Sequence, residues 1–235
     1  MPSRTIPTHD KRPSMSHWLE EALASMPAKG RLLLRGPQEL AFGFTDDRKT
    51  EKGNQDRAAI AYCLDPSQYG DPWFFAGVCD GVGGEPKGEI AASIALSEVL
   101  SELCAGNDGL SRGRLFDAIN RAHAAVRERL RGSATTFAGV LVSAKGTFSI
   151  GTVGDSRIYS VSQEEVVKLS QDDTLENMLR RQTPHANDAQ LKEVLQGLQQ
   201  RWKDSLGQAI GSEMPVEPRG ASWPHIAKED RKSVV

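Results

Sequence analysis

The sequence WFFAGVCDGVGG, at residues 73–84, decides the fold class. Residues 73–79 are a continuous apolar run of strand length, and Asp80 ends the run. Positions 81–84 hold three glycines and a valine, and the glycines leave the following loop with few Cβ atoms. The stretch therefore predicts a buried strand that opens into a flexible loop carrying a carboxylate at its start.

The segments on both sides of this strand predict an α+β domain. Residues 57–64 alternate weakly, as a strand does, while residues 88–104 and 114–131 each carry apolar side chains on one helical face. A series of short strands follows, and connections this short join only antiparallel neighbours. The predicted strands of this series lie at residues 136–143, 147–153, 158–161 and 165–169.

The length of 235 residues is sufficient for one domain with a substantial core. Residues 1–38 are rich in Pro, Arg, Lys and His and are predicted to form an N-terminal extension, with a short helix at residues 18–26. The domain is predicted to cover residues 39–235. Its later part includes helical patterns at residues 174–181 and 188–200.

Composition excludes several classes of protein. The 29 Lys and Arg residues are scattered and balanced by 31 Asp and Glu, so the net charge of −2 gives no field that would attract nucleic acid. No apolar run approaches the roughly 20 residues of a membrane span, and the N-terminus has no apolar signal region, so we expect a cytoplasmic protein. The three cysteines lie far apart, which favours buried thiols over a zinc or disulfide site.

Three carboxylates are predicted at strand ends: Asp56, Asp80 and Asp155. The Gly81 backbone can turn sharply and present its carbonyl beside Asp80, and oxygen ligands of this kind suit Mg²⁺ and Mn²⁺. Each position also has an ordinary interpretation: a polar loop for Asp56, a plain Asp-Gly turn for Asp80, and a hairpin turn for Asp155. For any one position alone the ordinary interpretation is preferred, and the order and spacing of all three favour a metal site.

The chain resembles the metal-dependent serine/threonine protein phosphatases, the protein phosphatase 2C or PPM type, in its bacterial form. The resemblance covers about residues 40–211 in family order. The matching stretches are NQDR (54–57), VCDGVGG (78–84), GE (88–89), AAS (91–93), TT (135–136), VGDSRIY (153–159), KLSQD (168–172) and LGQAIG (206–211).

The resemblance implies a four-layer α-β-β-α sandwich, in which two antiparallel sheets are flanked by helices and meet around two Mg²⁺ or Mn²⁺ ions. Asp80 would bridge the ions, the Gly81 carbonyl would complete one shell, Asp56 would bind the other ion, and Asp155 would serve a third, weaker site. Such ions lower the pKa of bound water and neutralise phosphate charge. The implied substrates are proteins phosphorylated on Ser or Thr, and a cognate Ser/Thr kinase is an implied partner.

Arg48 is the candidate for orienting the phosphate, because a guanidinium fork matches two phosphate oxygens. Its alternative interpretation is a solvated loop charge. Three further positions depart from the family pattern. Val82 replaces the histidine that some eukaryotic members use as an acid, Gln55 replaces Glu, and Asp173 stands where His is usual.

The C-terminal part of the family pattern is expected to be missing. Family members continue into a strand, a Ser-Asp-Gly turn and a final metal-binding Asp, whereas residues 212–235 contain no such turn, and Asp230 is followed by Arg231. The sandwich is therefore expected to be incomplete at the C-terminus. Besides an active enzyme, this leaves open a non-catalytic phosphatase-like binding module and an inactive truncated fragment.

Overall fold

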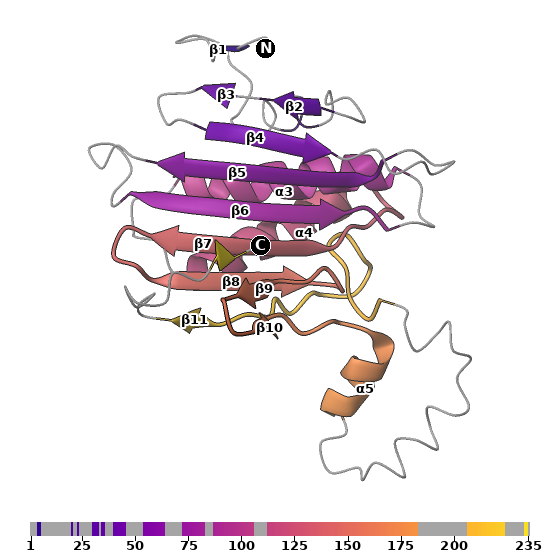
Figure 1. Ribbon diagram of the computed structural model, residues 1–235. Helices are drawn as coiled ribbons and strands as arrows, with labels where there is room; N and C mark the ends of the chain where they lie inside the picture. The colour runs from indigo at the N-terminus through magenta and orange to yellow at the C-terminus, as the bar shows by residue number, and fades with distance from the viewer. Residues whose placement is uncertain are drawn as a thin grey trace.

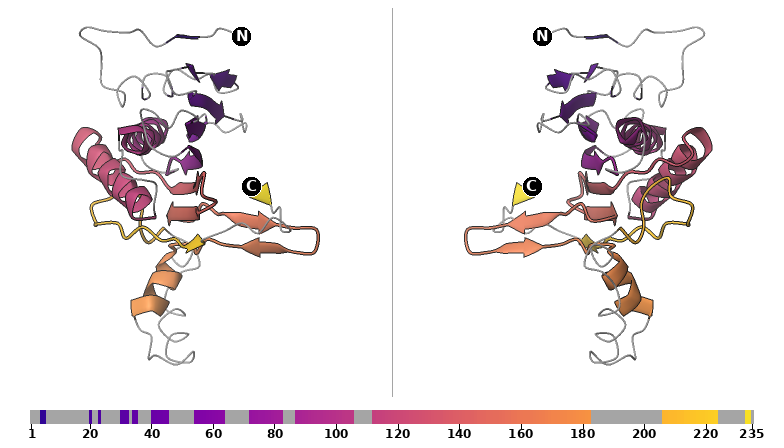
Figure 2. Two further views of the ribbon diagram at one scale, coloured as in Figure 1. Left: turned by 90° about the vertical axis from the view of Figure 1, so that its left-hand side faces the viewer. Right: turned by 90° about the vertical axis from the view of Figure 1, so that its right-hand side faces the viewer.

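One large antiparallel sheet organises the chain, with two long helices on one face and a smaller sheet on the other side (Figures 1 and 2). The structure is a computed structural model. It describes residues 4–5, 20, 23, 30–32, 34–35, 40–45, 54–63, 72–82, 87–105, 112–182, 206–223 and 233–234.

The large sheet has seven strands in the order β11-β8-β7-β6-β5-β4-β2, and every neighbouring pair is antiparallel. Its strands are β2 (Gly30–Leu32), β4 (Leu40–Thr45), β5 (Asp56–Cys63), β6 (Trp73–Asp80), β7 (Phe137–Ser143), β8 (Phe148–Val153) and β11 (Ser222–Trp223). The strands predicted at residues 57–64 and 73–79 are confirmed as β5 and β6. These two strands lie near the middle of the sheet, where both of their edges are paired.

Helices α3 (Gly88–Ala105) and α4 (Arg112–Arg129) cover one face of this sheet, as Figure 2 shows. Helix α3 packs on β5 and β6, and α4 packs on α3 and β8. The predicted apolar stripes are confirmed, because all but one of their members are buried. The buried members are Ala92, Leu96, Val99, Leu100 and Leu103 of α3, and Leu115, Ile119, Ala122 and Val126 of α4.

A second, three-stranded sheet has the order β10-β9-β12, and a short parallel pair is formed by β1 and β3. The bounds are β1 (Arg4–Thr5), β3 (Leu34–Arg35), β9 (Tyr159–Val161), β10 (Val166–Lys168) and β12 (Ser233–Val234). Helix α5 (Leu175–Gln182) follows β10 and confirms the helix predicted at residues 174–181. The helix predicted at residues 188–200 lies outside the described residues.

One predicted pairing is wrong. The short connection between β8 and β9 was expected to make them antiparallel neighbours, but β9 pairs with β10 and β12 in the second sheet. Gly154 adopts a φ of 97°, so the main chain turns away at the end of β8, and Ile158 is buried just before β9 begins. The β9–β10 hairpin consequently projects from the face opposite the helices (Figure 2).

Strand β6 shows how the two faces of the sheet differ. Trp73, Phe75 and Cys79 are buried beneath the helices, whereas Phe74 and Val78 are 39% and 44% exposed on the other face. Because side chains alternate along a strand, Asp80 also lies on the face away from the helices. The end of β6 thus directs a carboxylate toward the side where the second sheet lies.

Part of the predicted N-terminal extension contacts the domain. Of the short helix predicted at residues 18–26, the structure describes Glu20 and Leu23, both helical. Leu23 is 3% exposed and belongs to the main core cluster, and β2 forms an edge of the large sheet. The boundary at residue 38 stays a prediction.

Two of the three cysteines agree with the expectation of buried thiols. Cys79 and Cys104 are free and buried, and burial raises the pKa of the Cys79 thiol, to which the neighbouring Asp80 charge adds. None of the described helices combines the length and apolar character needed to cross a bilayer.

Candidate metal centre

The sheet brings Asp56 and Asp80 together. Asp56 is the first residue of β5 and Asp80 the last of β6, and the two are directly opposite in the antiparallel register. Directly opposed residues project their side chains from the same face, with Cβ atoms about 5 Å apart. Two of the predicted ligands therefore lie side by side, at the end of two central strands.

This juxtaposition has an electrostatic consequence. Both side chains are exposed, and like charges directly opposite on neighbouring strands destabilise a sheet. A divalent cation between the carboxylates removes that repulsion. The pair thus has the chemistry and spacing of a cation site.

The main chain at Asp80 is fixed by two threonines that precede β7. The Thr135 hydroxyl donates to the Asp80 carbonyl at 2.9 Å, and the amide of Asp80 donates to Oγ1 of Thr136 at 3.1 Å. The amide of Thr136 donates to the same carbonyl at 2.9 Å. Both threonines belong to the matching stretches, but this role is not evident from the sequence, because their partner lies 55 residues upstream of Thr135.

Gly81 is required by packing rather than by a left-handed backbone, because it forms an antiparallel bridge with Thr135 and is not among the glycines with a positive φ. A Cβ atom on Gly81 would lie 2.5 Å from the carbonyl carbon of Gly88, the first residue of α3. The reverse contact is also tight, because a Cβ on Gly88 would lie 3.1 Å from the Gly81 carbonyl carbon. The start of α3 therefore rests directly on the main chain of Asp80 and Gly81.

Asp155 lies at the same end of the strands as Asp56 and Asp80, but not beside these two carboxylates. It is exposed just after β8, and β7 separates β8 from β6. Two strand spacings place this turn roughly 10 Å from Asp80. The hydroxyls of Ser156 and Thr136 lie 2.6 Å apart and connect the turn to the Asp80 amide through Thr136.

The donor set fits a metal that retains much of its hydration. Among the described residues, no group of three or more His, Cys, Asp or Glu side chains could hold a metal ion. Mg²⁺ sites commonly use only one or two carboxylates, with waters and substrate phosphates as the other ligands. Asp56 and Asp80 match that type of site and do not match a closed structural metal site.

The turn before β5 is organised by its own side chains and by a buried arginine. The amide of Asp56 donates to Oδ1 of Asn54 at 2.8 Å, and Nη1 of Arg57 donates to the Asp56 carbonyl at 2.7 Å. Burial lowers the pKa of Arg57 from its ordinary value, while the charges of Glu89 and Asp56 raise it. Arg57 was not predicted as a functional residue, although a charged residue on the same strand face as Ala59 and Ala61 was a usable signal.

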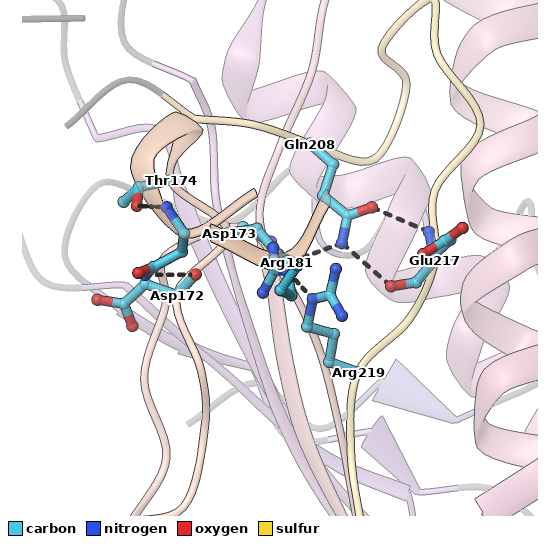
Figure 3. A network of polar contacts seen from close by, with 9 residues as sticks. Asp172, Asp173, Thr174, Arg181, Gln208, Glu217 and Arg219 are labelled. Atoms are coloured by element: carbon cyan, nitrogen blue, oxygen red, sulfur yellow. Dashed lines mark hydrogen bonds and ion pairs between the residues drawn. The ribbon is translucent and has the colours of Figure 1, made fainter. Parts of the chain in front are cut away.

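A second polar cluster surrounds Asp173, the residue that stands where His is usual (Figure 3). Its carboxylate is fully buried and accepts hydrogen bonds from two arginines, a glutamine and a backbone amide. The donors are Nη2 of Arg181 (2.9 Å), Nε of Arg219, Nε2 of Gln208 (2.6 Å) and the amide of Gly154 (3.2 Å). The Asp173 amide also donates to the Gly154 carbonyl at 2.8 Å, so this cluster supports the turn that carries Asp155.

A cavity of about 580 Å³ lies beside this cluster, and its lining includes Arg181, Gln208 and Arg219. Neither Asp56 nor Asp80 lines it. Arg48, the predicted phosphate-orienting residue, lies outside the described residues.

Comparison with known proteins places the chain in a family. The protein phosphatase 2C family profile matches residues 45–209, which is more than half of the chain. A search among curated proteins found no match.

Solved bacterial phosphatases share the fold. Serine/threonine phosphatase Stp1 from Staphylococcus aureus superposes with a TM-score of 0.60 at 22% identity, covering 84% of this chain and 73% of that chain. The S. agalactiae serine/threonine phosphatase superposes with a TM-score of 0.57 at 22% identity, covering 77% of this chain and 72% of that chain. The PPM Ser-Thr phosphatase MsPP from Mycobacterium smegmatis, solved with cacodylate, superposes with a TM-score of 0.53 at 23% identity, covering 79% of this chain and 71% of that chain.

The solved structures therefore confirm the α+β fold. Because their sequence identity to this chain is low, they establish the fold alone. The family rests on the matched profile and on the motifs in their expected order. On these grounds, the chain belongs to the protein phosphatase 2C family.

Proposed function

We propose that this protein hydrolyses phosphoserine and phosphothreonine on proteins with the help of divalent cations. The observation that carries the proposal is the direct pairing of Asp56 with Asp80 across β5 and β6. Membership of the phosphatase family supports it independently. A cognate Ser/Thr kinase and a cytoplasmic location stay predictions.

Asp56, Asp80 and the Gly81 carbonyl would hold two Mg²⁺ or Mn²⁺ ions, and Asp155 a third, weaker one. Bound divalent ions lower the pKa of water and neutralise the charge of a phosphate, which permits direct in-line attack at neutral pH. Arg48 is proposed to orient the phosphate through its planar fork.

The chain's own residues would place these groups with little freedom. The sheet register sets Asp56 against Asp80, and the bonds from Thr135 and Thr136 hold the Asp80 main chain. Val82 has no titratable side chain, so this position supplies no proton to the leaving alkoxide.

Hydrolysis of a phosphothreonine peptide tests the proposal. The full chain is assayed with and without Mn²⁺, and Asp80→Asn and Asp56→Asn are expected to lower kcat/KM at least about 100-fold, because each removes an anionic ligand from the ions. Asp117→Asn, which neutralises an exposed carboxylate on α4, is the matched control and should keep full activity. A turnover rate that changes neither on addition of Mn²⁺ nor in Asp80→Asn contradicts the proposal.

A second candidate is a non-catalytic phosphatase-like module that binds a phosphorylated protein. It is favoured by the absence, within the described part of the chain, of a third carboxylate or histidine beside Asp56 and Asp80. Calorimetry separates the two functions. Phosphopeptide binding without turnover in saturating Mn²⁺ supports the module, and steady Mn²⁺-dependent turnover rejects it.

A further inference from the structure

Arg57 is a charged side chain in a position where a strand normally places an apolar one. It is 6% exposed and lies on the helix-covered face of β5, in register with Ala59 and Ala61. A buried guanidinium loses hydration and must recover it through hydrogen bonds, so its partners show what it holds in place.

The partners of Arg57 come from three separate segments. Nη1 donates to the carbonyls of Asn54 at 3.4 Å and Asp56 at 2.7 Å, both in the turn that leads into β5. Nε donates to Oγ of Ser93 in α3 and to the carbonyl of Leu23, each at 3.1 Å. One planar, rigid fork thus joins the turn before Asp56, the helix above the sheet and the N-terminal segment.

Ser93 and Leu23, the two partners of Arg57 that anchor it outside the turn, are themselves fixed. Ser93 donates its hydroxyl proton to the Glu89 carbonyl at 2.8 Å, one turn earlier in α3. The Leu23 side chain is 3% exposed and packs in the main core. Arg57 therefore connects the main chain of the Asn54–Asp56 turn to rigid parts of the fold.

We infer that Arg57 is a positioning residue, which fixes the main chain of the Asn54–Asp56 turn so that the Asp56 carboxylate stands opposite Asp80. The inference rests on the proposed function, because it concerns the same cation site. Arg57 touches neither substrate nor cation in this role. It acts through two backbone carbonyls and makes the site depend on residues as distant in sequence as Leu23 and Ser93.

Mn²⁺ binding separates positioning from a simple effect of charge. Removal of a buried positive charge near a cation site would by itself strengthen Mn²⁺ binding. If Arg57 positions Asp56, then Arg57→Met instead weakens binding about 10-fold or more, as loss of outer-shell partners does. Arg57→Lys keeps the charge but lacks the fork, so positioning predicts weaker Mn²⁺ binding for this variant as well.

The experiment is calorimetric Mn²⁺ titration of the full chain, at a temperature where thermal unfolding shows each variant to be folded. Arg114→Met is the matched control, since Arg114 also donates to two backbone carbonyls, those of Glu102 and Leu103, but at the end of α3 that is remote from Gly88. We expect this control to lose stability and to keep the wild-type Kd for Mn²⁺. Should Arg57→Met fail to fold, Ser93→Ala removes one of the two anchors. This variant is expected to weaken Mn²⁺ binding about two- to five-fold.

The outcomes distinguish the inference from the proposed function. Wild-type protein that does not bind Mn²⁺ overturns both. Wild-type binding that is lost in Asp80→Asn but unchanged or tighter in Arg57→Met and Arg57→Lys overturns the positioning role and leaves the proposed function standing. Weaker Mn²⁺ binding in both Arg57 variants, beside an unchanged Arg114→Met, supports the inference.

Discussion

Single residues at the site are constrained by contacts that neighbouring segments impose. Gly81 is the clearest case, because the carbonyl carbon of Gly88 occupies the space of a Cβ atom. A side chain there would have to displace backbone at the start of α3, and backbone yields less readily than a flexible side chain.

We predict that Gly81→Ala lowers the free energy of unfolding by about 2 kcal/mol, as overpacking does, and also weakens Mn²⁺ binding by moving the main chain of Asp80 and Gly81. Chemical denaturation and Mn²⁺ titration measure the two effects. Gly132→Ala is the control. Its φ of 73° is unfavourable for alanine but nothing lies within 4 Å of the added Cβ, so it should lose about 1 kcal/mol and bind Mn²⁺ normally. Normal Mn²⁺ binding by Gly81→Ala would contradict the packing argument.

Residues whose side-chain type indicates their chemistry could be predicted from the sequence, whereas residues whose role depends on a distant partner could not. Asp56 and Asp80 were predicted from carboxylates at strand ends, and the structure places them together. Thr136 and Arg57 had no predicted role, because hydroxyls and guanidinium groups acquire one only when the fold brings an acceptor to them. Asp155 was predicted too, but its separation from the pair depends on strand order, which spacing along the chain does not encode.

Among the secondary structure elements, α4 has a second task besides covering β8. His123, near its middle, is 7% exposed, and its Nδ1 accepts a hydrogen bond from the Gly211 amide at 3.1 Å. The segment from Leu206 to Gly211 is thereby attached to α4, and Ile210 exchanges backbone hydrogen bonds with Thr135 beside the site. A neutral imidazole is needed for this bond, since a protonated one has no acceptor.

Burial lowers the pKa of His123, the charge of Arg127 lowers it further, and the main chain of Ala209 opposes both by raising it. The unfolded chain therefore binds more protons than the folded one as the pH falls through the ordinary value of 6.5, and stability falls with it. We predict that the free energy of unfolding falls between pH 7.5 and pH 5.5, and that it falls less in His123→Gln. Urea unfolding at the two pH values measures it, and equal pH dependence in both proteins would refute the prediction.

The apolar stripes of α3 and α4 were predictable because helix periodicity alone fixes which side chains share a face. The path after β8 was not. A connection of a few residues fits a hairpin as well as a passage into another sheet, and Gly154 and Ile158 decide between them only in the folded context.

Across the whole molecule, the buried Asp173 joins segments that are far apart in sequence. It accepts from the turn after β8, from α5 and from the segment that runs along the sheet toward β11 (Figure 3). Arg181 and Arg219 both form ion pairs with it, so removal of the carboxylate leaves two guanidinium groups without their common partner.

We predict that Asp173→Asn lowers the free energy of unfolding by about 3 kcal/mol, the scale of a broken buried ion pair. Glu176→Gln serves as the control, because it removes the exposed ion pair with Arg180 and should cost less than about 1 kcal/mol. Urea denaturation of both variants checks the difference. Losses of similar size would mean that Asp173 is no more important than a surface charge.

The face-to-face placement of Asp56 and Asp80 is a product of the hydrogen-bond ladder between β5 and β6. Side chains alternate with a period of two, so deletion of one residue inside β5 would turn the first carboxylate toward the helices while leaving composition and hydrophobicity almost unchanged. A change of one residue in the length of β5 would therefore separate the two carboxylates, whereas a change of two residues would keep them on the same face.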